Sequence, residues 1–87
     1  MGKKMEELKN AKMIMFIEDV LIVDGEPKLN ISVRKVKDIG EDKITVYGYG
    51  EDITYNRVIS FWNNEGNKYY SKYDKSTAIE TILNNRI

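Results

Sequence analysis

The side chains of this chain that could do chemistry are carboxylates, lysines and tyrosines, because histidine and cysteine are both absent. Histidine is the commonest general base and a frequent metal ligand, and cysteine supplies thiolate nucleophiles and zinc ligands. The acidic residues gather at positions 38–42 and 51–52, without the spacing of a calcium-binding loop. Turns commonly collect such solvated acids. We therefore expect no enzyme activity, no catalytic residue, no metal site and no cofactor.

Aromatic side chains form the second group of functional candidates. The stretch from Lys43 to Tyr70 holds five of the six tyrosines and the single tryptophan. Aromatic rings beside cationic groups can stack on bases or anchor a protein partner, and strand tyrosines are also common for packing alone. The composition leaves these three uses open. The candidate binding residues are Tyr47, Tyr49, Arg57, Trp62 and Arg34.

A Gly-Tyr-Gly sequence at residues 48–50 is the feature closest to a phosphate-binding loop. A dinucleotide loop needs a third glycine ahead of a helix, whereas Ile53 holds that position and a strand is expected to follow. We interpret the two glycines as the site of a bulge or sharp bend that aromatic rings cover. In the expected strand over residues 43–50, Tyr47 and Tyr49 share the outward face.

The elements that would position these residues follow from the hydrophobic pattern of one domain, residues 1–87. Residues 1–11 are predicted to be a short helix or a disordered lead, residues 12–73 an antiparallel sheet, and residues 75–86 a helix. Turn signals at residues 24–27, 40–42 and 63–67 contribute to dividing the sheet into five strands. After Asp74 the apolar residues recur at helical spacing, with Asp74, Ser76 or Thr77 as the cap.

Two strands carry apolar residues on both faces, which predicts irregular pairing. In residues 13–23 the expected bulge falls at Glu18-Asp19. In the next strand Val36 is out of phase with the alternation of residues 29–33, so a bulge is expected near Arg34-Lys35. The predicted fold is α+β, a strongly curved five-stranded antiparallel sheet or small β-barrel with a C-terminal helix and a short N-terminal helix.

The segment from Val20 to Trp62 resembles a Sm/Hfq-type small barrel. Its sequences VLIVDG, KLNISVRKV, DKITVYG and ITYNRVISFW fall in the order that such barrels use, after a short helix. The resemblance implies a small barrel, but the helix expected from Lys75 departs from it and the RNA-site residues of the family have no counterparts to assign. The ending GNKYYSKYDKSTAIETIL is similar to the end of a pleckstrin-like domain. The two resemblances exclude each other, so the sequence assigns no family.

Charge and composition narrow the classes of partner. Basic and acidic residues balance at 14 each, whereas a duplex-DNA binder normally has a basic excess. The apolar run from Met13 to Ile17 is shorter than the about 7–15 residues of a secretory core or the about 18 of a membrane span. We expect a cytoplasmic protein without a membrane partner. The abundance of Lys, Asn, Ile and Tyr, whose codons are AT-rich, indicates a low-GC bacterium or its phage.

The sequence favours a small non-catalytic protein that recognises another protein through a tyrosine-rich face of the sheet. A phage or bacterial regulator that inhibits a host factor by occlusion fits this description, with Tyr47, Tyr49, Trp62 and Arg57 as anchors. The alternative is a small β-barrel that binds single-stranded nucleic acid or a nucleotide by tyrosine stacking. The apolar face of the C-terminal helix and the surplus apolar residues of the first strand also allow a homodimer.

Overall fold

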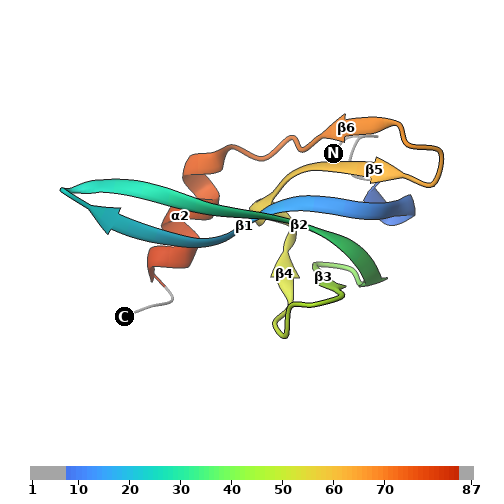
Figure 1. Cartoon of the computed structure of the whole chain (residues 1–87), viewed down its shortest axis with the longest axis horizontal. Coiled ribbons are helices and arrows are strands. Elements are labelled where there is room, and N and C mark those ends of the chain that lie inside the picture. The colour runs from blue at the N-terminus through green and yellow to red at the C-terminus, as the bar shows by residue number, and fades with distance from the viewer. Residues whose placement is uncertain (1–7, 85–87) are drawn as a thin grey trace.

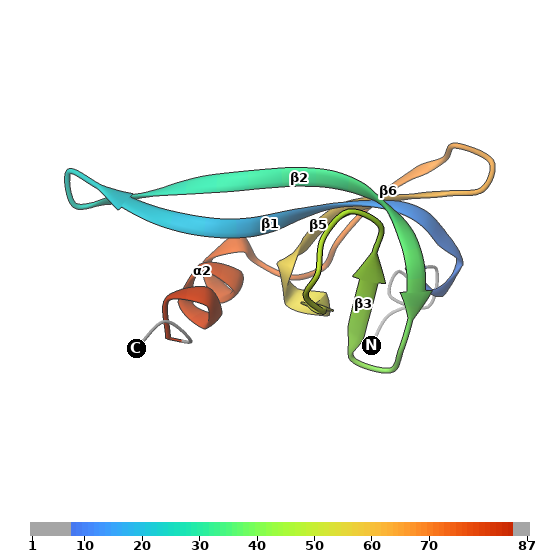
Figure 2. The ribbon, with the colours of Figure 1, turned by 60° about the horizontal axis from the view of Figure 1, so that its bottom comes forward.

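The computed structural model describes residues 8–84 and confirms the α+β class (Figure 1). Six strands pair antiparallel in the order β4-β3-β2-β1-β5-β6. The sheet curls so that β3 and β4 fold beneath the central strands (Figure 2). The elements in chain order are η1 Leu8–Asn10, β1 Ala11–Val23, β2 Glu26–Ile39, β3 Lys43–Val46, β4 Ile53–Thr54, η2 Tyr55–Arg57, β5 Val58–Asn63, β6 Lys68–Tyr70 and α2 Lys75–Asn84.

The number of strands is six instead of the predicted five, because the fourth predicted strand is interrupted. The 3-10 turn η2 divides this segment into β4 and β5. At the start of the turn the Thr54 hydroxyl donates to Asn56 Oδ1 at 2.7 Å. At its end the Val58 N–H donates to the Tyr55 carbonyl, a backbone bond within the turn in place of one to a neighbouring strand. The β-branched and aromatic residues around them nevertheless look like a continuous strand in the sequence.

Strand β1 contributes buried residues to two hydrophobic clusters. The predicted bulge at Glu18-Asp19 is confirmed. The pairing of β1 with β2 shifts register between Ile17 and Asp19. Before the shift, Phe16 is fully buried in a first cluster with Ile14 and Phe61. Ile17, the last paired residue before the shift, and Val20, after it, are buried in a second cluster that includes Ala78 of α2. The change from one cluster to the other therefore falls between Phe16 and Ile17, directly before the bulge, and the residues after the bulge continue in the second cluster.

The second predicted bulge, near Arg34-Lys35, is wrong in position. The β1–β2 register runs unbroken from Met13 opposite Lys35 to Ile17 opposite Ile31. The irregularity lies further along β2, between Val36 and Asp38, in its pairing with β3. Val36 needs no change of face, because it follows the same alternation as Arg34 and packs against the first cluster.

Helix α2 confirms the predicted C-terminal helix and one of its predicted caps. The Ser76 N–H donates to Asp74 Oδ1 at 3.2 Å, so Asp74 satisfies a free amide of the first turn. Ala78 is buried, and Ile79, Ile82 and Leu83 pack on the second cluster. Residues 85–86 of the predicted helix and residues 1–7 of the predicted N-terminal element lie outside the described residues. The described part of that element, residues 8–11, consists of η1 and the first residue of β1. Between residues 8 and 84 no helix is long and apolar enough to cross a membrane.

Candidate binding face on the outer side of the sheet

Strand register defines one side of the sheet, here called the outer face. Side chains directly opposite each other on antiparallel strands point to the same side. One row across β2, β1, β5 and β6 consists of Lys35, Met13, Trp62 and Lys68. The next row consists of Val33, Met15, Ser60 and Tyr70. The alternate positions hold the buried residues Ile14 and Phe61 of the first cluster, so both rows face away from that cluster.

Tyr47 extends the first row beyond β2. Val46 pairs with Val36 and is buried in the first cluster. The next amide, that of Tyr47, donates to the Lys35 carbonyl at 3.0 Å, so Tyr47 lies beside Lys35. Its side chain points opposite to that of Val46 and is 58% exposed. The outer face therefore has nine members, Tyr47 and the eight residues of the two rows.

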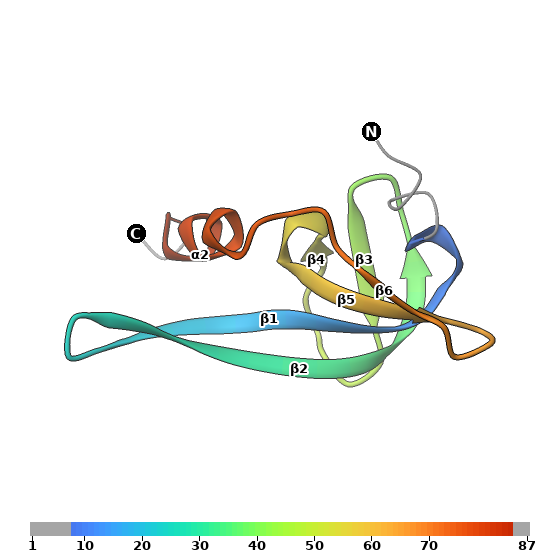
Figure 3. The same cartoon turned by 90° about the horizontal axis from the view of Figure 1, so that it is seen from above.

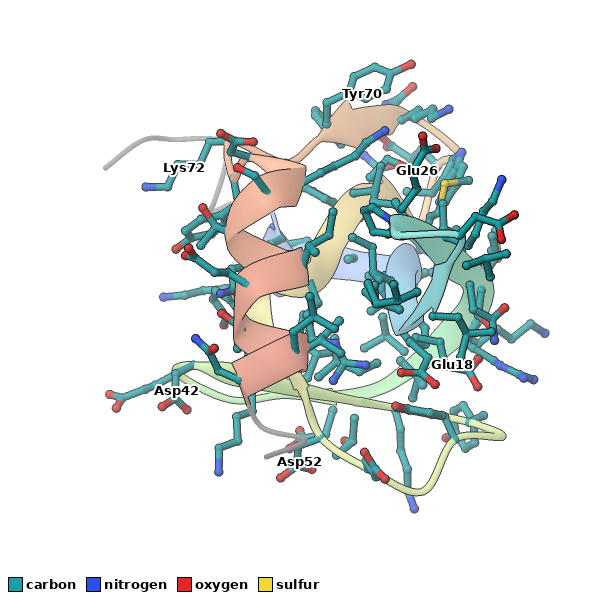
Figure 4. All side chains as sticks on the ribbon, turned by 90° about the vertical axis from the view of Figure 1, so that its left-hand side faces the viewer. Glu18, Glu26, Asp42, Asp52, Tyr70 and Lys72 are labelled. Atoms are coloured by element: carbon teal, nitrogen blue, oxygen red, sulfur yellow. The ribbon has the colours of Figure 1, made fainter. Side chains whose placement is uncertain are left out.

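The β5–β6 end of the outer face is aromatic and basic. Lys68 Nζ lies 5.4 Å from the centroid of the Trp62 ring and 5.1 Å from that of Tyr70. These distances are within the range of a cation–π interaction. Tyr70 is 61% exposed, and it projects from the side of the molecule opposite to Asp42 and Asp52 (Figure 4). This end therefore presents rings and a cation with the turn acids far away.

The middle of the outer face is aliphatic. Val33 is 45% exposed, and Met13 and Met15 beside it are half-buried. Ser60 is buried, with its hydroxyl 3.8 Å from the Met15 sulfur, so it contributes little polarity. Adjoining apolar residues on the surface of a small domain mark an interaction site more often than scattered ones do.

Three of the five predicted binding residues, Tyr49, Arg57 and Arg34, lie on the other side of the sheet. The expected strand over residues 43–50 ends at Val46, and Tyr47 and Gly48 form a turn. The turn reverses the expected direction of Tyr49, whose ring centroid lies 5.4 Å from that of Phe16. Tyr47 and Tyr49 therefore do not share a face, whereas Tyr47 and Trp62 do.

Arg57 binds the backbone of β1 just beyond the point where the pairing of β1 with β5 ends. Strand β5 pairs with β1 only as far as Phe16. Beyond that point, Arg57 Nε donates to the Ile17 carbonyl at 2.9 Å and Nη2 to the Glu18 carbonyl at 2.8 Å. Nη2 also donates to the Tyr49 hydroxyl at 3.2 Å. The guanidinium thus supplies hydrogen-bond donors to two carbonyls of β1 that have no paired strand on that side.

The predicted bend at Gly48 is confirmed, but the side chain that lies next to the glycine is Arg34 and not an aromatic ring. Gly48 has φ +83°, a conformation that favours glycine. A Cβ at Gly48 would lie 2.9 Å from Arg34 Nη1. A guanidinium, in place of the predicted ring, therefore approaches the bare backbone. Arg34 Nε is buried and has no hydrogen-bond partner within the described part of the chain.

Two of the turn acids, Glu41 and Asp42, line a shallow hollow of about 360 Å³ with Tyr55 and Tyr73. The Tyr55 hydroxyl donates to the Gly40 carbonyl. Burial raises the pKa of Tyr55, and the negative charge of Asp42, the nearby Tyr73 and the charge of Glu41 raise it further. A phenol with a raised pKa stays neutral at physiological pH and acts as a donor, not as a base. No three carboxylates within residues 8–84 gather into a cation site.

Sequence reasoning missed several members of the outer face, chiefly Tyr70, Lys68, Val33 and the two methionines. Tyr70 and Lys68 alternate along one short strand, which was the available signal. Their proximity to Trp62 depends on the pairing of β5 with β6, and that of Met13 on the pairing of β1 with β5. Comparison of the chain with protein-family models, with curated proteins and with solved structures finds no match.

Proposed function

We propose that this chain is a small, non-catalytic, cytoplasmic protein that recognises another protein through the outer face. The observation that carries the proposal is the gathering of exposed apolar and aromatic side chains on one side of the sheet. None of the nine outer-face residues is acidic, and the rings lie at both ends of an aliphatic middle. Tyrosine and tryptophan dominate the energetics of protein interfaces, and methionine adapts to a partner's shape.

The mode of action that fits this face is occlusion. The chain offers neither imidazole nor thiol, and the raised pKa of Tyr55 keeps that phenol protonated and unavailable as a base. A rigid sheet can cover a partner's surface without any reaction. A phage or bacterial regulator that inhibits a host factor in this way is the function that the composition favours.

The test removes the two most exposed rings of the outer face together. The double variant Tyr47→Ser, Tyr70→Ser is immobilised beside the wild type, and proteins captured from a lysate of the source organism are quantified by mass spectrometry. Tyr73→Ser is the matched control, because Tyr73 is exposed but lies outside the outer face. A specific partner should be retained by the wild type and the control, and should fall by roughly tenfold or more with the double variant.

The melting temperature of the double variant should stay within a few degrees of that of the wild type, because both rings are solvent-exposed. Capture of the same proteins by the wild type and the double variant would contradict the proposal. So would the absence of any enriched protein.

Lys68 favours a second candidate function, the binding of single-stranded nucleic acid. Its ammonium lies over both the Trp62 and Tyr70 rings, and Lys35 follows in the same row. Rings for base stacking beside cations for phosphates are what such binding needs. Oligonucleotide titration should then quench Trp62 fluorescence, and the affinity should fall steeply with salt and with Lys68→Gln. Protein recognition through an aliphatic centre should be much less sensitive to salt.

A further inference from the structure

The outer edge of β2 is open over most of its length. Strand β2 spans Glu26–Ile39, yet β3 pairs with it only from Val36 onward. Among residues 8–84, the hydrogen bond from the Tyr47 amide to the Lys35 carbonyl is the last backbone bond on this side. Over residues 26–34 no described strand lies along this edge. In Figure 3, β2 runs along the border of the molecule, and β5 and α2 lie on the far side of β1.

Backbone groups of alternate residues face this edge. The hairpin turn at Asp24-Gly25 has positive φ at both residues and pairs Val23 with Glu26. In a two-residue turn of this kind the flanking pair is hydrogen-bonded, so the even-numbered residues of β2 bond to β1. The odd-numbered residues then turn their N–H and C=O groups outward, as the Lys35 carbonyl does. Leu29, Ile31 and Val33 carry such groups, and no described strand pairs with them.

The two outermost strands of the sheet are protected by being short, and the open part of β2 is not. Strand β4 has two residues and β6 has three, and short edge strands are poor templates for pairing. The open edge of β2 is longer, and its side chains Ile31 and Val33 are 43% and 45% exposed. A long edge with apolar side chains is a site where a further strand adds.

We propose that the strand added to this edge is β2 of a second copy of the chain, antiparallel and related by a two-fold axis at Ile31. The sequence Leu29-Asn30-Ile31-Ser32-Val33 is symmetric in character about its centre. Pairing about that centre places Ile31 opposite its counterpart, Leu29 opposite Val33, and Asn30 opposite Ser32. A self-complementary surface of this kind is what a two-fold dimer requires.

The pairing between the two copies of β2 would be short, because at each end of the open edge one backbone group cannot form a further hydrogen bond. Pro27 lacks an N–H and cannot donate to the second copy beyond Leu29. At the other end the Lys35 carbonyl is already bound by Tyr47. On the inner side, the next pair would place Lys28 of one copy opposite Arg34 of the other. The Arg34 side chain is directed toward Gly48 of its own chain. The dimer would place two outer faces side by side in one continuous sheet, and it does not depend on what the outer face binds.

The test measures the mass of the full chain in solution by sedimentation velocity over a range of concentrations. We expect twice the chain mass of 10.1 kDa for the wild type. Ile31→Lys places two like charges on the axis and should raise the dissociation constant at least tenfold. Leu21→Lys is the matched control, because Leu21 is a similarly exposed apolar residue on the other strand of the hairpin. Circular dichroism and the melting temperature establish that both variants are folded.

A second variant keeps the proposal testable if Ile31→Lys fails to fold. The chain has no cysteine, so Ile31→Cys introduces a single thiol on the axis, where opposite Cα atoms would be about 5.5 Å apart. Mild oxidation should give a disulfide-linked dimer with Ile31→Cys and little with Leu29→Cys or Leu21→Cys. A wild type that is monomeric up to about 1 mM, or equal cross-linking of the three variants, would overturn the proposal.

Discussion

Tyr47 and Tyr49 stand two residues apart in the chain, yet they serve opposite sides of the sheet. Tyr47 is exposed on the outer face beside Lys35. Tyr49 packs against Phe16, and its hydroxyl accepts a hydrogen bond from Arg57. The turn at Gly48 separates them. The same residue type is therefore solvent-exposed on one side of the sheet and gives structural support on the other, and the direction of the backbone decides which.

The arginines on the inner side extend the comparison. Arg57 donates to two backbone carbonyls and a hydroxyl, and so ties β1 to the segment before β5. Arg34 contacts Gly48 closely, but its buried Nε has no partner among residues 8–84. Hydrogen bonds from a charged group stabilise a fold, whereas an unbonded buried donor costs stability. The two guanidiniums should therefore differ strongly in their contributions.

The largest expected effect is the loss of stability on Arg57→Met. Removal of its hydrogen bonds leaves the Ile17 and Glu18 carbonyls without those donors, which should lower the free energy of unfolding by about 2–3 kcal/mol. Arg34→Met, the matched control, keeps the stem and removes a buried Nε that has no partner among residues 8–84, so its cost should stay below about 1 kcal/mol. Urea unfolding followed by Trp62 fluorescence measures both. Equal losses would show that the arginines support the sheet alike.

The two tyrosines provide the next prediction. Tyr49→Ala removes the ring packed on Phe16 and the hydroxyl bonded to Arg57, which should cost about 2 kcal/mol. Tyr47→Ala should change the free energy of unfolding by less than about 0.5 kcal/mol, because its ring is solvent-exposed. The same urea titration measures both variants. A large loss on Tyr47→Ala would place its ring in a packed environment and remove it from the outer face.

The glycines on either side of Tyr49 allow a finer test. Gly48→Ala forces a side chain into a positive φ and close to Arg34, and should cost about 1 kcal/mol. A Cβ added at Gly50 would meet no heavy atom within 4 Å, and the φ of Gly50 is not positive. Gly50→Ala should therefore be neutral within about 0.5 kcal/mol. If the two substitutions cost the same, the turn does not depend on the conformation of Gly48.

Sequence reasoning succeeded where the signal is local. The bulge at Glu18-Asp19 follows from the change of apolar parity, and the start of α2 follows from Asp74 and the change of period. It failed where a local pattern fits two structures equally well. The segment around Tyr55 has the composition of a strand, although η2 interrupts it, and the stretch after Val46 looks extended, although it turns.

Only a small part of the outer face could be predicted from the sequence, for a different reason. Its exposed rings could be named from residue type, and Tyr47 and Trp62 were among them. Which residues lie beside them depends on the pairing of β1 with β5, two strands far apart in the chain. That choice is made by long-range packing of Ile14 and Phe16 on Phe61 and Val58, which no short stretch of sequence contains.

The smallest expected effect concerns Tyr55 and the alkaline limit of stability. Its pKa in the folded chain lies above the ordinary value of 10.0, chiefly through burial. Below pH 10 the phenol is neutral in both states, and its contribution to stability is fully present. As the pH rises toward the folded pKa, the unfolded chain loses the proton first, so the free energy of unfolding falls.

Tyr55→Phe should remove this pH dependence while costing about 1 kcal/mol at neutral pH through the lost bond to the Gly40 carbonyl. Asp42→Asn should weaken the pH dependence only in part, because the Asp42 charge is the second cause and burial the first. Urea unfolding at a series of pH values above neutrality measures both variants. Alkaline profiles of Tyr55→Phe and the wild type that coincide would show that another group sets the limit, since the hydroxyl is the only group this substitution removes.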